Sequence, residues 1–286
     1  MKIKFTKMHG AGNDFVMIDD RSGNFPEHDT RLVKALASRG TGIGCEGVLI
    51  VRLAESFSDC DYKMIFLNPD GSRASMCGNA SRCVGLFAFE NGIGGRHQRV
   101  GTDAGIITVE VLESDSGHGT ACVHMTEPKD RAPCGHVDLP GGRRAECFKV
   151  DTGVPHAVVF VDDVDMVDVD TDGRIIRFAD FFAPAGVNVD FVQVSRDEAP
   201  HAMRTYERGV EGESGACGTG AVAAGVAMAE KLGIKLPVAF KVRSGDCLAV
   251  DGTVDGSGLC HGMTLTGPVR KVFEGYLETN WVVEPR

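Results

Sequence analysis

The chain has 286 residues, which is long enough for two domains of ordinary size. Its composition, with 43% hydrophobic and 24% charged residues, is typical of a folded globular protein and excludes a disordered one. Forty acidic against 30 basic residues give a net charge of −10, and the basic residues form no cluster, so we expect no nucleic-acid partner. No apolar run approaches the roughly 18 residues that would span a bilayer, so we expect no membrane partner.

The N-terminal segment 1–7 alternates apolar and polar residues and carries no apolar core of a signal peptide. We therefore expect it to form a strand and the protein to be cytoplasmic. In such a reducing compartment the ten cysteines predict free thiols rather than a disulfide framework, and most should be small buried hydrophobes. No C-x-x-C motif occurs, and the Cys/His pairs are too sparse for four ligands, so no metal site is predicted.

Helix and strand patterns indicate the elements in chain order. We expect helices over residues 30–39, 79–90 and 219–232, and strands over 66–67, 105–111, 156–162, 187–194 and 237–242. The helix 219–232 is apolar on every side and mostly small, so it should be buried all round, with a sheet wrapped around it. A charged segment with two prolines, 127–133, is the expected join between the domains.

Three pairs of similar segments indicate a duplicated domain, because they follow one another in the same order at nearly one offset. Their offsets are 140, 141 and 144 residues, for Cys77 and Cys217, Gly12 and Gly153, and segments 46–50 and 190–194. We expect an N-terminal domain over 1–127, completed by a C-terminal strand over 268–286, and a second domain over 128–267. The two copies of a duplicated site would lie opposite each other across a cleft.

Two other motifs do not fit the binding sites that they resemble. Residues 42–47 match G-x-G-x-x-G, but a helix precedes the motif and an apolar run follows it, which is the reverse of a dinucleotide site. Residues 168–173 resemble the start of a calcium loop, yet Ala179 stands where the bidentate Glu belongs. We expect the second segment to be an acidic loop in solvent.

Each repeat contributes a Cys-Gly pair that opens a helix. A helix N-terminus attracts anions, so it stabilises a thiolate and lowers its pKa, and its N–H groups beside Gly78 and Gly218 can bind a carboxylate. Two such helices aimed at one amino acid would place Cys77 and Cys217 on opposite faces of its Cα. That arrangement suits proton removal on one face and delivery on the other, whereas a hydrolase needs only one nucleophile. No lysine and phosphate cradle for pyridoxal is marked, so no cofactor is expected.

At these residues the chain resembles the diaminopimelate epimerase family of pyridoxal-independent racemases. The resemblance covers nearly the whole chain and is carried by segments 7–15, 68–72, 76–79, 153–156, 187–188, 206–209 and 216–220. It implies an α/β (α+β) fold of two pseudo-symmetric domains. Each would be a mixed sheet curled into a barrel around a central helix, with the active site in the cleft between them. It also implies an isomerase that interconverts LL- and meso-diaminopimelate for lysine and peptidoglycan precursors, and a homodimer is a further expectation.

The resemblance also assigns roles to residues. Cys77 and Cys217 would be the acid and base, with His156 as the proton partner of Cys77 and Glu207 as that of Cys217. Other residues would bind the substrate, some at the two helix-start turns that hold its reacting carboxylate and some at its distal end. They are Asn13, Asn68, Gly78, Asn79, Asn188, Glu207, Arg208, Gly218 and Thr219. No metal is implied.

Two departures from the family leave alternatives open. Val154 stands where many relatives have Asn, and Gly47 stands where some have Gln, both near the substrate. A racemase or epimerase of another amino acid, such as histidine or a proline derivative, is therefore the nearest alternative. A redox-responsive thiol protein, in which Cys77 and Cys217 form a switchable disulfide, is an alternative from another class.

Overall fold

The computed structural model describes residues 2–54, 59–197 and 199–279. The chain divides into two compact units, one formed by residues up to Val123 together with those from Gly267 on, and the other by His124–Thr266. Within the described residues no helix has the length and apolar character needed to cross a membrane. The last part of the expected C-terminal strand, 280–286, lies outside the described residues.

Unit 1 is a mixed sheet that closes on itself. Its elements are β1 (Lys2–Gly10), β2 (Asn13–Asp19), α1 (Thr30–Ala37), β3 (Gly47–Leu53), β4 (Tyr62–Leu67), β5 (Arg73–Ala74), α2 (Gly78–Glu90), β6 (His97–Thr102), β7 (Gly105–Asp115), β8 (His118–His124) and the C-terminal part of β17 (Cys260–Glu278). Strand β2 is antiparallel to β1 and parallel to β3, and β4 is antiparallel to β3 and parallel to β6. Strand β17 pairs with both β1 and β8, which closes the barrel.

Unit 2 repeats this plan. Its elements are β9 (Lys129–Leu139), β10 (Arg143–Asp151), β11 (Pro155–Val161), α3 (Val169–Arg177), β12 (Asn188–Gln193), β13 (His201–Glu207), β14 (Gly212–Ser214), α4 (Gly218–Leu232), β15 (Val238–Lys241), β16 (Cys247–Val254) and the start of β17. Strands β11 and β12 are parallel, as β2 and β3 are, and β13 is antiparallel to β12 and parallel to β15. The duplication predicted from the three segment pairs is confirmed by this matched order of strands.

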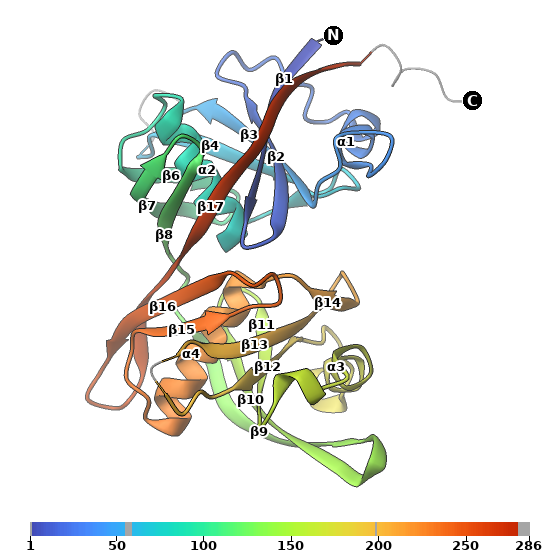
Figure 1. The fold of residues 1–286 in the computed structure, drawn as a ribbon, viewed down its shortest axis with the longest axis vertical. Coiled ribbons are helices and arrows are strands. Elements are labelled where there is room, and N and C mark those ends of the chain that lie inside the picture. Colours follow the sequence, from blue (N-terminus) through green and yellow to red (C-terminus); the bar gives the residue numbers. More distant parts are fainter. Residues whose placement is uncertain (1, 55–58, 198, 280–286) are drawn as a thin grey trace. The chain divides into compact units, whose positions relative to one another are not determined.

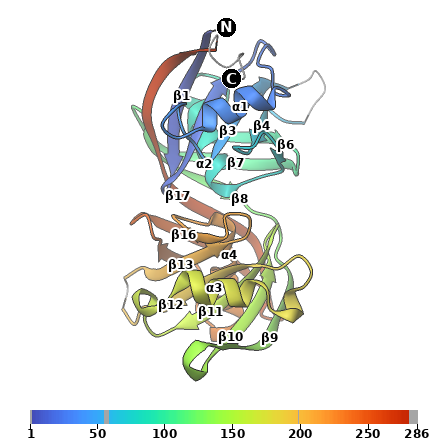
Figure 2. The ribbon, with the colours of Figure 1, turned by 90° about the vertical axis from the view of Figure 1, so that its right-hand side faces the viewer.

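A buried helix lies among the strands of each unit (Figure 1, Figure 2). Helix α4 is buried along almost its whole length, as its apolar and small side chains predict. A Cβ on Gly225 would lie 2.8 Å from Val250 of β16, and one on Gly85 of α2 would lie 2.4 Å from Val109 of β7. Glycine in each central helix therefore lets a strand approach closely, and the predicted fold class is confirmed.

A second, amphipathic helix packs on each sheet, α1 in unit 1 and α3 in unit 2. Helix α1 ends at Ala37, two residues earlier than predicted, because Ser38 has extended backbone angles. The expectation of an exposed acidic loop over 168–173 is wrong. Asp168 caps α3 by accepting a hydrogen bond from the Thr171 N–H, and Asp172 is buried against Arg143 at 2.6 Å.

Two further expectations are corrected. Strand β9 begins at Lys129, so most of the segment 127–133 is paired strand rather than a join. Among the cysteines expected to be buried hydrophobes, Cys247 is exposed and the others divide into buried and half-buried thiols. The buried ones are Cys45, Cys83, Cys147 and Cys260, and the half-buried ones are Cys60, Cys122 and Cys134.

Candidate functional site

Cys77 lies at the start of the central helix of unit 1. Its backbone is extended, with φ −148° and ψ 128°, and the helix begins at the next residue, Gly78. The thiol is half-buried, and its Sγ lies 3.8 Å from Oδ1 of Asn13 at the start of β2. The first turn of a helix has N–H groups without partners in the helix, so this end of α2 is suited to bind an anion beside the sulfur.

The amide groups around Cys77 are held by a buried arginine. The Asn79 side chain donates to Asn13 Oδ1 at 3.3 Å, and Arg82 Nη2 donates to Asn79 Oδ1 at 2.8 Å. Arg82 is fully buried, and the Asn13 amide also donates to the carboxylate of Glu46. These contacts fix which way both amides point, so Asn13 presents its carbonyl oxygen to Cys77 and Asn79.

Asn68 follows β4 in a tight turn. Its amide donates to Ser72 Oγ at 3.0 Å, and the Asp70 carboxylate accepts from the Ser72 N–H at 2.8 Å. The turn therefore fixes the Asn68 side chain through its own neighbours rather than through the other predicted site residues.

Cys217 occupies in unit 2 the position that Cys77 has in unit 1, one residue before Gly218 and the helix α4. Only 6% of Cys217 is exposed. Burial raises its pKa well above the ordinary value, and the charges of Glu207 and Asp190 raise it further, although the Thr219 hydroxyl and a backbone N–H partly oppose them. The lowered pKa expected from the helix N-terminus is therefore wrong for Cys217, which is held as a thiol.

His156 forms a buried chain of hydrogen bonds. Its Nδ1 lies 2.7 Å from Asp190 Oδ2, and neither side chain is exposed. Its Nε2 lies 3.0 Å from Thr219 Oγ1, and that hydroxyl lies 3.4 Å from the sulfur of Cys217. Thr205 donates to the other oxygen of Asp190 at 2.8 Å. The carboxylate thus orients the imidazole, because an acceptor at Nδ1 keeps the proton on that nitrogen.

Three more predicted residues meet near the start of β12. Oδ1 of Asn188 accepts a hydrogen bond from the backbone N–H of Arg208 at 2.7 Å, and its Nδ2 lies 3.4 Å from His156 Nε2. Glu207 is the last residue of β13, and its charge acts on Cys217. The guanidinium of Arg208 makes long contacts, 3.5 Å, to the carbonyls of Ala185 and Gly186.

The structure thus forms two half-sites on one plan. In unit 1, Cys77, Asn79 and Asn13 come together; in unit 2, Cys217 and Thr219 join His156, Asn188, Glu207 and Arg208. In each unit the second residue after the cysteine contacts a side chain at the start of a strand, Asn79 to Asn13 and Thr219 to His156. The matched geometry is what a duplicated site requires.

Sequence reasoning missed the residues that orient this machinery. They are Glu46 and Arg82 in unit 1, and Asp190 and Thr205 in unit 2. The sequence marked Glu46 and Asp190 in one way: each is the first residue of its segment in a matched pair. That shared position could have indicated that they have corresponding roles. In the described part of the chain, no cluster of three or more His, Cys, Asp or Glu side chains is arranged to hold a metal ion.

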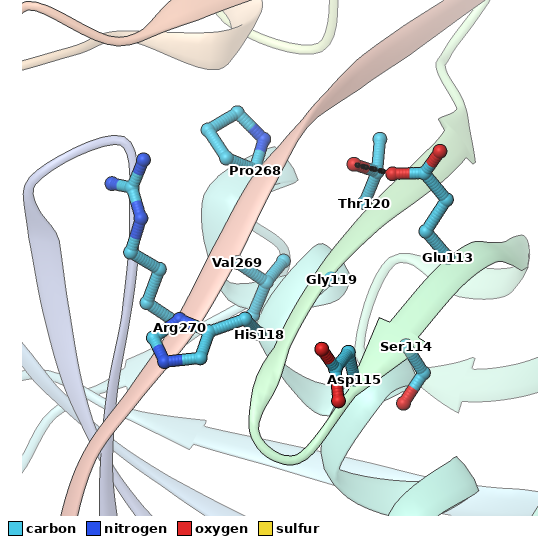
Figure 3. A pocket seen from close by; sticks show the side chains of 9 residues that line it. All are labelled: Glu113, Ser114, Asp115, His118, Gly119, Thr120, Pro268, Val269 and Arg270. Atoms are coloured by element: carbon cyan, nitrogen blue, oxygen red, sulfur yellow. Dashed lines mark hydrogen bonds between the residues drawn. The ribbon is translucent and has the colours of Figure 1, made fainter.

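A separate hollow of about 370 Å³ lies between the β7–β8 hairpin and β17 (Figure 3). Acidic Glu113 and Asp115 and basic His118 and Arg270 are among its lining residues. Thr120 donates to Glu113 at 3.4 Å across its rim. It contains none of the predicted site residues.

The family model for diaminopimelate epimerase matches residues 5–129 and again residues 148–272. The chain belongs to the diaminopimelate epimerase family. It is 40% identical to the diaminopimelate epimerase of Aquifex aeolicus over 291 aligned residues, covering 96% of this chain and 98% of the relative. It is 38% identical to that of Archaeoglobus fulgidus, covering 98% of both. As a member of this family, the protein is therefore an isomerase of the epimerase class.

Solved structures agree at the level of the fold. A Bacillus anthracis phenazine biosynthesis protein of the PhzF family has a TM-score of 0.73 at 17% identity, covering 97% of this chain and 99% of that one. A hydroxyproline epimerase from Agrobacterium vitis has a TM-score of 0.70 at 16% identity, covering 96% and 92%. At such identities the likeness concerns the fold alone.

Proposed function

We propose that this protein interconverts LL- and meso-2,6-diaminopimelate by a cofactor-independent two-base mechanism, with Cys77 and Cys217 on opposite faces of the reacting Cα. The observation that carries the proposal is the matched position of the two cysteines, each preceding a buried central helix in one of two repeats. Family membership names the substrate, since the relatives above are diaminopimelate epimerases. The reaction belongs to lysine and peptidoglycan precursor synthesis.

The two helix starts bind the reacting carboxylate. Backbone N–H groups of Gly78 and Asn79, and of Gly218 and Thr219, lie in first helical turns and have no acceptor four residues earlier within their helices. They donate to the substrate carboxylate while the helix dipoles favour its negative charge. As the Cα proton leaves, negative charge spreads onto that carboxylate, so the same donors stabilise the carbanion most strongly in the transition state.

The protonation of Cys217 sets the direction of the first step. Because burial raises the pKa of Cys217, this residue starts as the thiol and gives its proton to Cα. Cys77, as thiolate, removes the proton from the opposite face. One proton leaves Cα and one arrives, so the configuration inverts and the two sulfurs exchange protonation states. The reverse reaction uses them in the opposite roles.

His156 and Glu207 return the sulfurs to their starting states. Asp190 holds the imidazole of His156 in one orientation, and the charge of Glu207 acts directly on Cys217. We assign His156 to Cys77 and Glu207 to Cys217 as proton partners. In this assignment the contact of His156 Nε2 with Thr219, beside Cys217, holds the imidazole in place and is not its proton path. The distal amino-acid end of the substrate is then left mostly to Asn68, Asn188 and Arg208, while Asn13 lies beside Cys77 at the reacting end. The Arg208 guanidinium is suited to that end, because its fork binds both oxygens of a carboxylate.

The substrate is tested by proton exchange. The protein is incubated in deuterated water with LL-diaminopimelate, histidine, proline and hydroxyproline in turn, and loss of the Cα proton signal is followed by NMR. We expect exchange with diaminopimelate alone. Exchange with another amino acid and none with diaminopimelate would assign the substrate to that alternative.

A redox thiol protein is the alternative from another class. Cys77→Ser and Cys217→Ser are tested singly for epimerisation under reducing conditions, where a disulfide switch is silent. Both should lose activity if each sulfur transfers a proton. A redox protein would have no epimerase activity to lose, and a variant with full activity would remove that cysteine from the mechanism.

A further inference from the structure

A second pair of cysteines lies apart from the two central helices, on the β9–β10 hairpin of unit 2. Cys134 is in β9 and Cys147 is in β10. Both fall between the two segments that match the family model, which end at residue 129 and resume at residue 148. The family match therefore covers neither cysteine.

The register of the hairpin places the two cysteines close to each other on neighbouring strands. Glu146 pairs with His136 and Phe148 with Pro133, so the single residue Cys147 lies opposite two residues, Cys134 and Gly135. This is a β-bulge, and the φ of +88° at Gly135 is the left-handed conformation that such a bulge favours in glycine. The bulge places the two cysteines on directly adjacent strands.

The Cys134 side chain packs against the buried core cluster that contains Cys147. Cys134 Sγ lies 3.3 Å from the backbone carbonyl oxygen of Cys147. Cys147 Sγ itself donates to the Ala145 carbonyl at 3.8 Å, and the side-chain interaction with Cys147 lowers the pKa of Cys134. Neighbouring strands lie about 4.7–4.9 Å apart, which is within the Cα range that a disulfide bridges.

The two thiols differ in access. Cys147 is fully buried, whereas Cys134 is half-buried on the strand that a small reagent can reach. The positive charge of Lys149 also lowers the pKa of Cys134, although less than the Cys147 hydrogen bond does. Cys134 is therefore the nucleophile of the pair, and Cys147 is suited to complete the bond from inside.

We propose that Cys134 and Cys147 form a redox-active dithiol that a low-molecular-weight disulfide, such as oxidised glutathione, converts to a cross-strand disulfide. The Cys134 thiolate attacks one sulfur of the small disulfide and expels one thiolate, leaving a mixed disulfide. Cys147 then loses its proton and attacks the Cys134 sulfur, which expels the second thiolate. The protein dithiol loses two electrons, and the small disulfide becomes two thiols after taking up the two protons.

Peptide mapping tests this directly, because trypsin separates the two cysteines. Cleavage after Arg131, Arg143, Arg144 and Lys149 gives peptides 132–143 and 145–149 with one cysteine each. The protein is treated with oxidised glutathione, blocked with an alkylating agent and digested without reduction. We expect the two peptides to be joined, with the loss of two hydrogens, as their main form, and to separate when a dithiol reductant is added first.

Two serine variants test the order of attack. In Cys147→Ser, peptide 132–143 should stop at the mixed disulfide with glutathione. In Cys134→Ser, peptide 145–149 should stay unmodified because its thiol is buried. The exposed Cys247 is the control for reagent activity. The proposal is overturned if Cys247 is modified while the two peptides stay reduced, or if 132–143 carries glutathione in the unaltered protein without any cross-link. Neither result depends on the epimerase mechanism, since a cross-link of Cys77 to Cys217 would join different peptides.

Discussion

Asp190 Oδ2 lies 2.7 Å from His156 Nδ1, and both side chains are completely buried. The contact determines which ring nitrogen is available for proton transfer. With its proton kept on Nδ1, the imidazole has Nε2 as its free base, and that atom is directed to Thr219 beside Cys217. Asp190 thus acts through His156 as a positioning residue.

The first prediction concerns Asp190. Asp190→Asn keeps the shape of the side chain but removes the negative charge that orients the imidazole. We expect epimerisation to fall on the order of 10²-fold, because proton transfer by a positioned group contributes at least that much. The pH profile of kcat should also shift, since a purely structural loss would not move it.

Asp172→Asn is the matched control, because Asp172 is also a buried carboxylate of unit 2 but pairs with Arg143. It should lower stability and leave the pH profile unchanged. An Asp190→Asn variant whose profile matches that of the unaltered protein would contradict the positioning role.

The second prediction concerns recognition of the distal end of the substrate. Arg208→Lys keeps the charge but loses the planar fork that binds both oxygens of a carboxylate. We expect KM for diaminopimelate to rise about tenfold with a smaller change in kcat. Arg204→Lys is the control, since Arg204 is bound to Glu213 and to two carbonyls and is assigned no substrate contact. An unchanged KM in Arg208→Lys would remove Arg208 from the substrate site.

The sequence predicted the helices of the barrel cores well, because their patterns are local. The buried helices were predicted from residue 79 and residue 219, and α2 and α4 begin one residue earlier. Helix α3 was missed because Asp168, which caps it, and Asp170 and Asp172 within it are typical of a solvated loop. Only the fold reveals that Arg143, 29 residues away, neutralises Asp172.

The same limit applies to the site. Cys77, Asn79, Cys217 and Thr219 are found by local motifs that recur in the two repeats. Asp190 and Thr205 act through partners on neighbouring strands, 34 and 15 residues away in the chain, so only the position of Asp190 in the repeat marks either of them. Likewise, the raised pKa of Cys217 depends on burial by other elements, which outweighs the helix terminus that sequence reasoning emphasised.

The third prediction concerns stability at high pH. Burial raises the pKa of Cys83 from 9.0 to about 12, and those of Cys45 and Cys260 to about 11. The unfolded chain therefore releases these protons at lower pH than the folded protein does. Their contribution to stability is complete below pH 9 and is lost as the pH rises towards 12.

Urea unfolding at several pH values measures this effect. The free energy of unfolding should fall above pH 9, and it should fall less steeply in Cys83→Ala. Cys247→Ser, which changes an exposed thiol, should leave the slope as it is. Equal slopes in Cys83→Ala and the unaltered protein would contradict the raised pKa of Cys83.

The fourth prediction concerns Gly47. A Cβ at this buried position of β3 would lie 2.4 Å from Cε2 of Phe66 on β4, so the aromatic ring occupies the space of a side chain. We expect Gly47→Ala to lower the free energy of unfolding by about 1–3 kcal/mol. Adding Phe66→Leu should restore part of the loss, because the smaller side chain makes room.

Gly256→Ala is the control for this steric argument, since a Cβ there has no neighbour within 4 Å. It should change stability very little. If Gly47→Ala changed the free energy of unfolding as little as the control does, contact with the Phe66 ring would not explain the glycine at position 47.

The most direct test of the two-base mechanism is where deuterium appears when LL-diaminopimelate reacts in deuterated water. If separate sulfurs remove and deliver the proton, deuterium enters the newly formed meso product at its inverted Cα, while the remaining LL substrate keeps its proton in the initial phase. If one group served both faces, deuterium would enter the LL substrate as fast as the product. That second result, or unchanged inversion in Cys77→Ser or Cys217→Ser, would contradict the account.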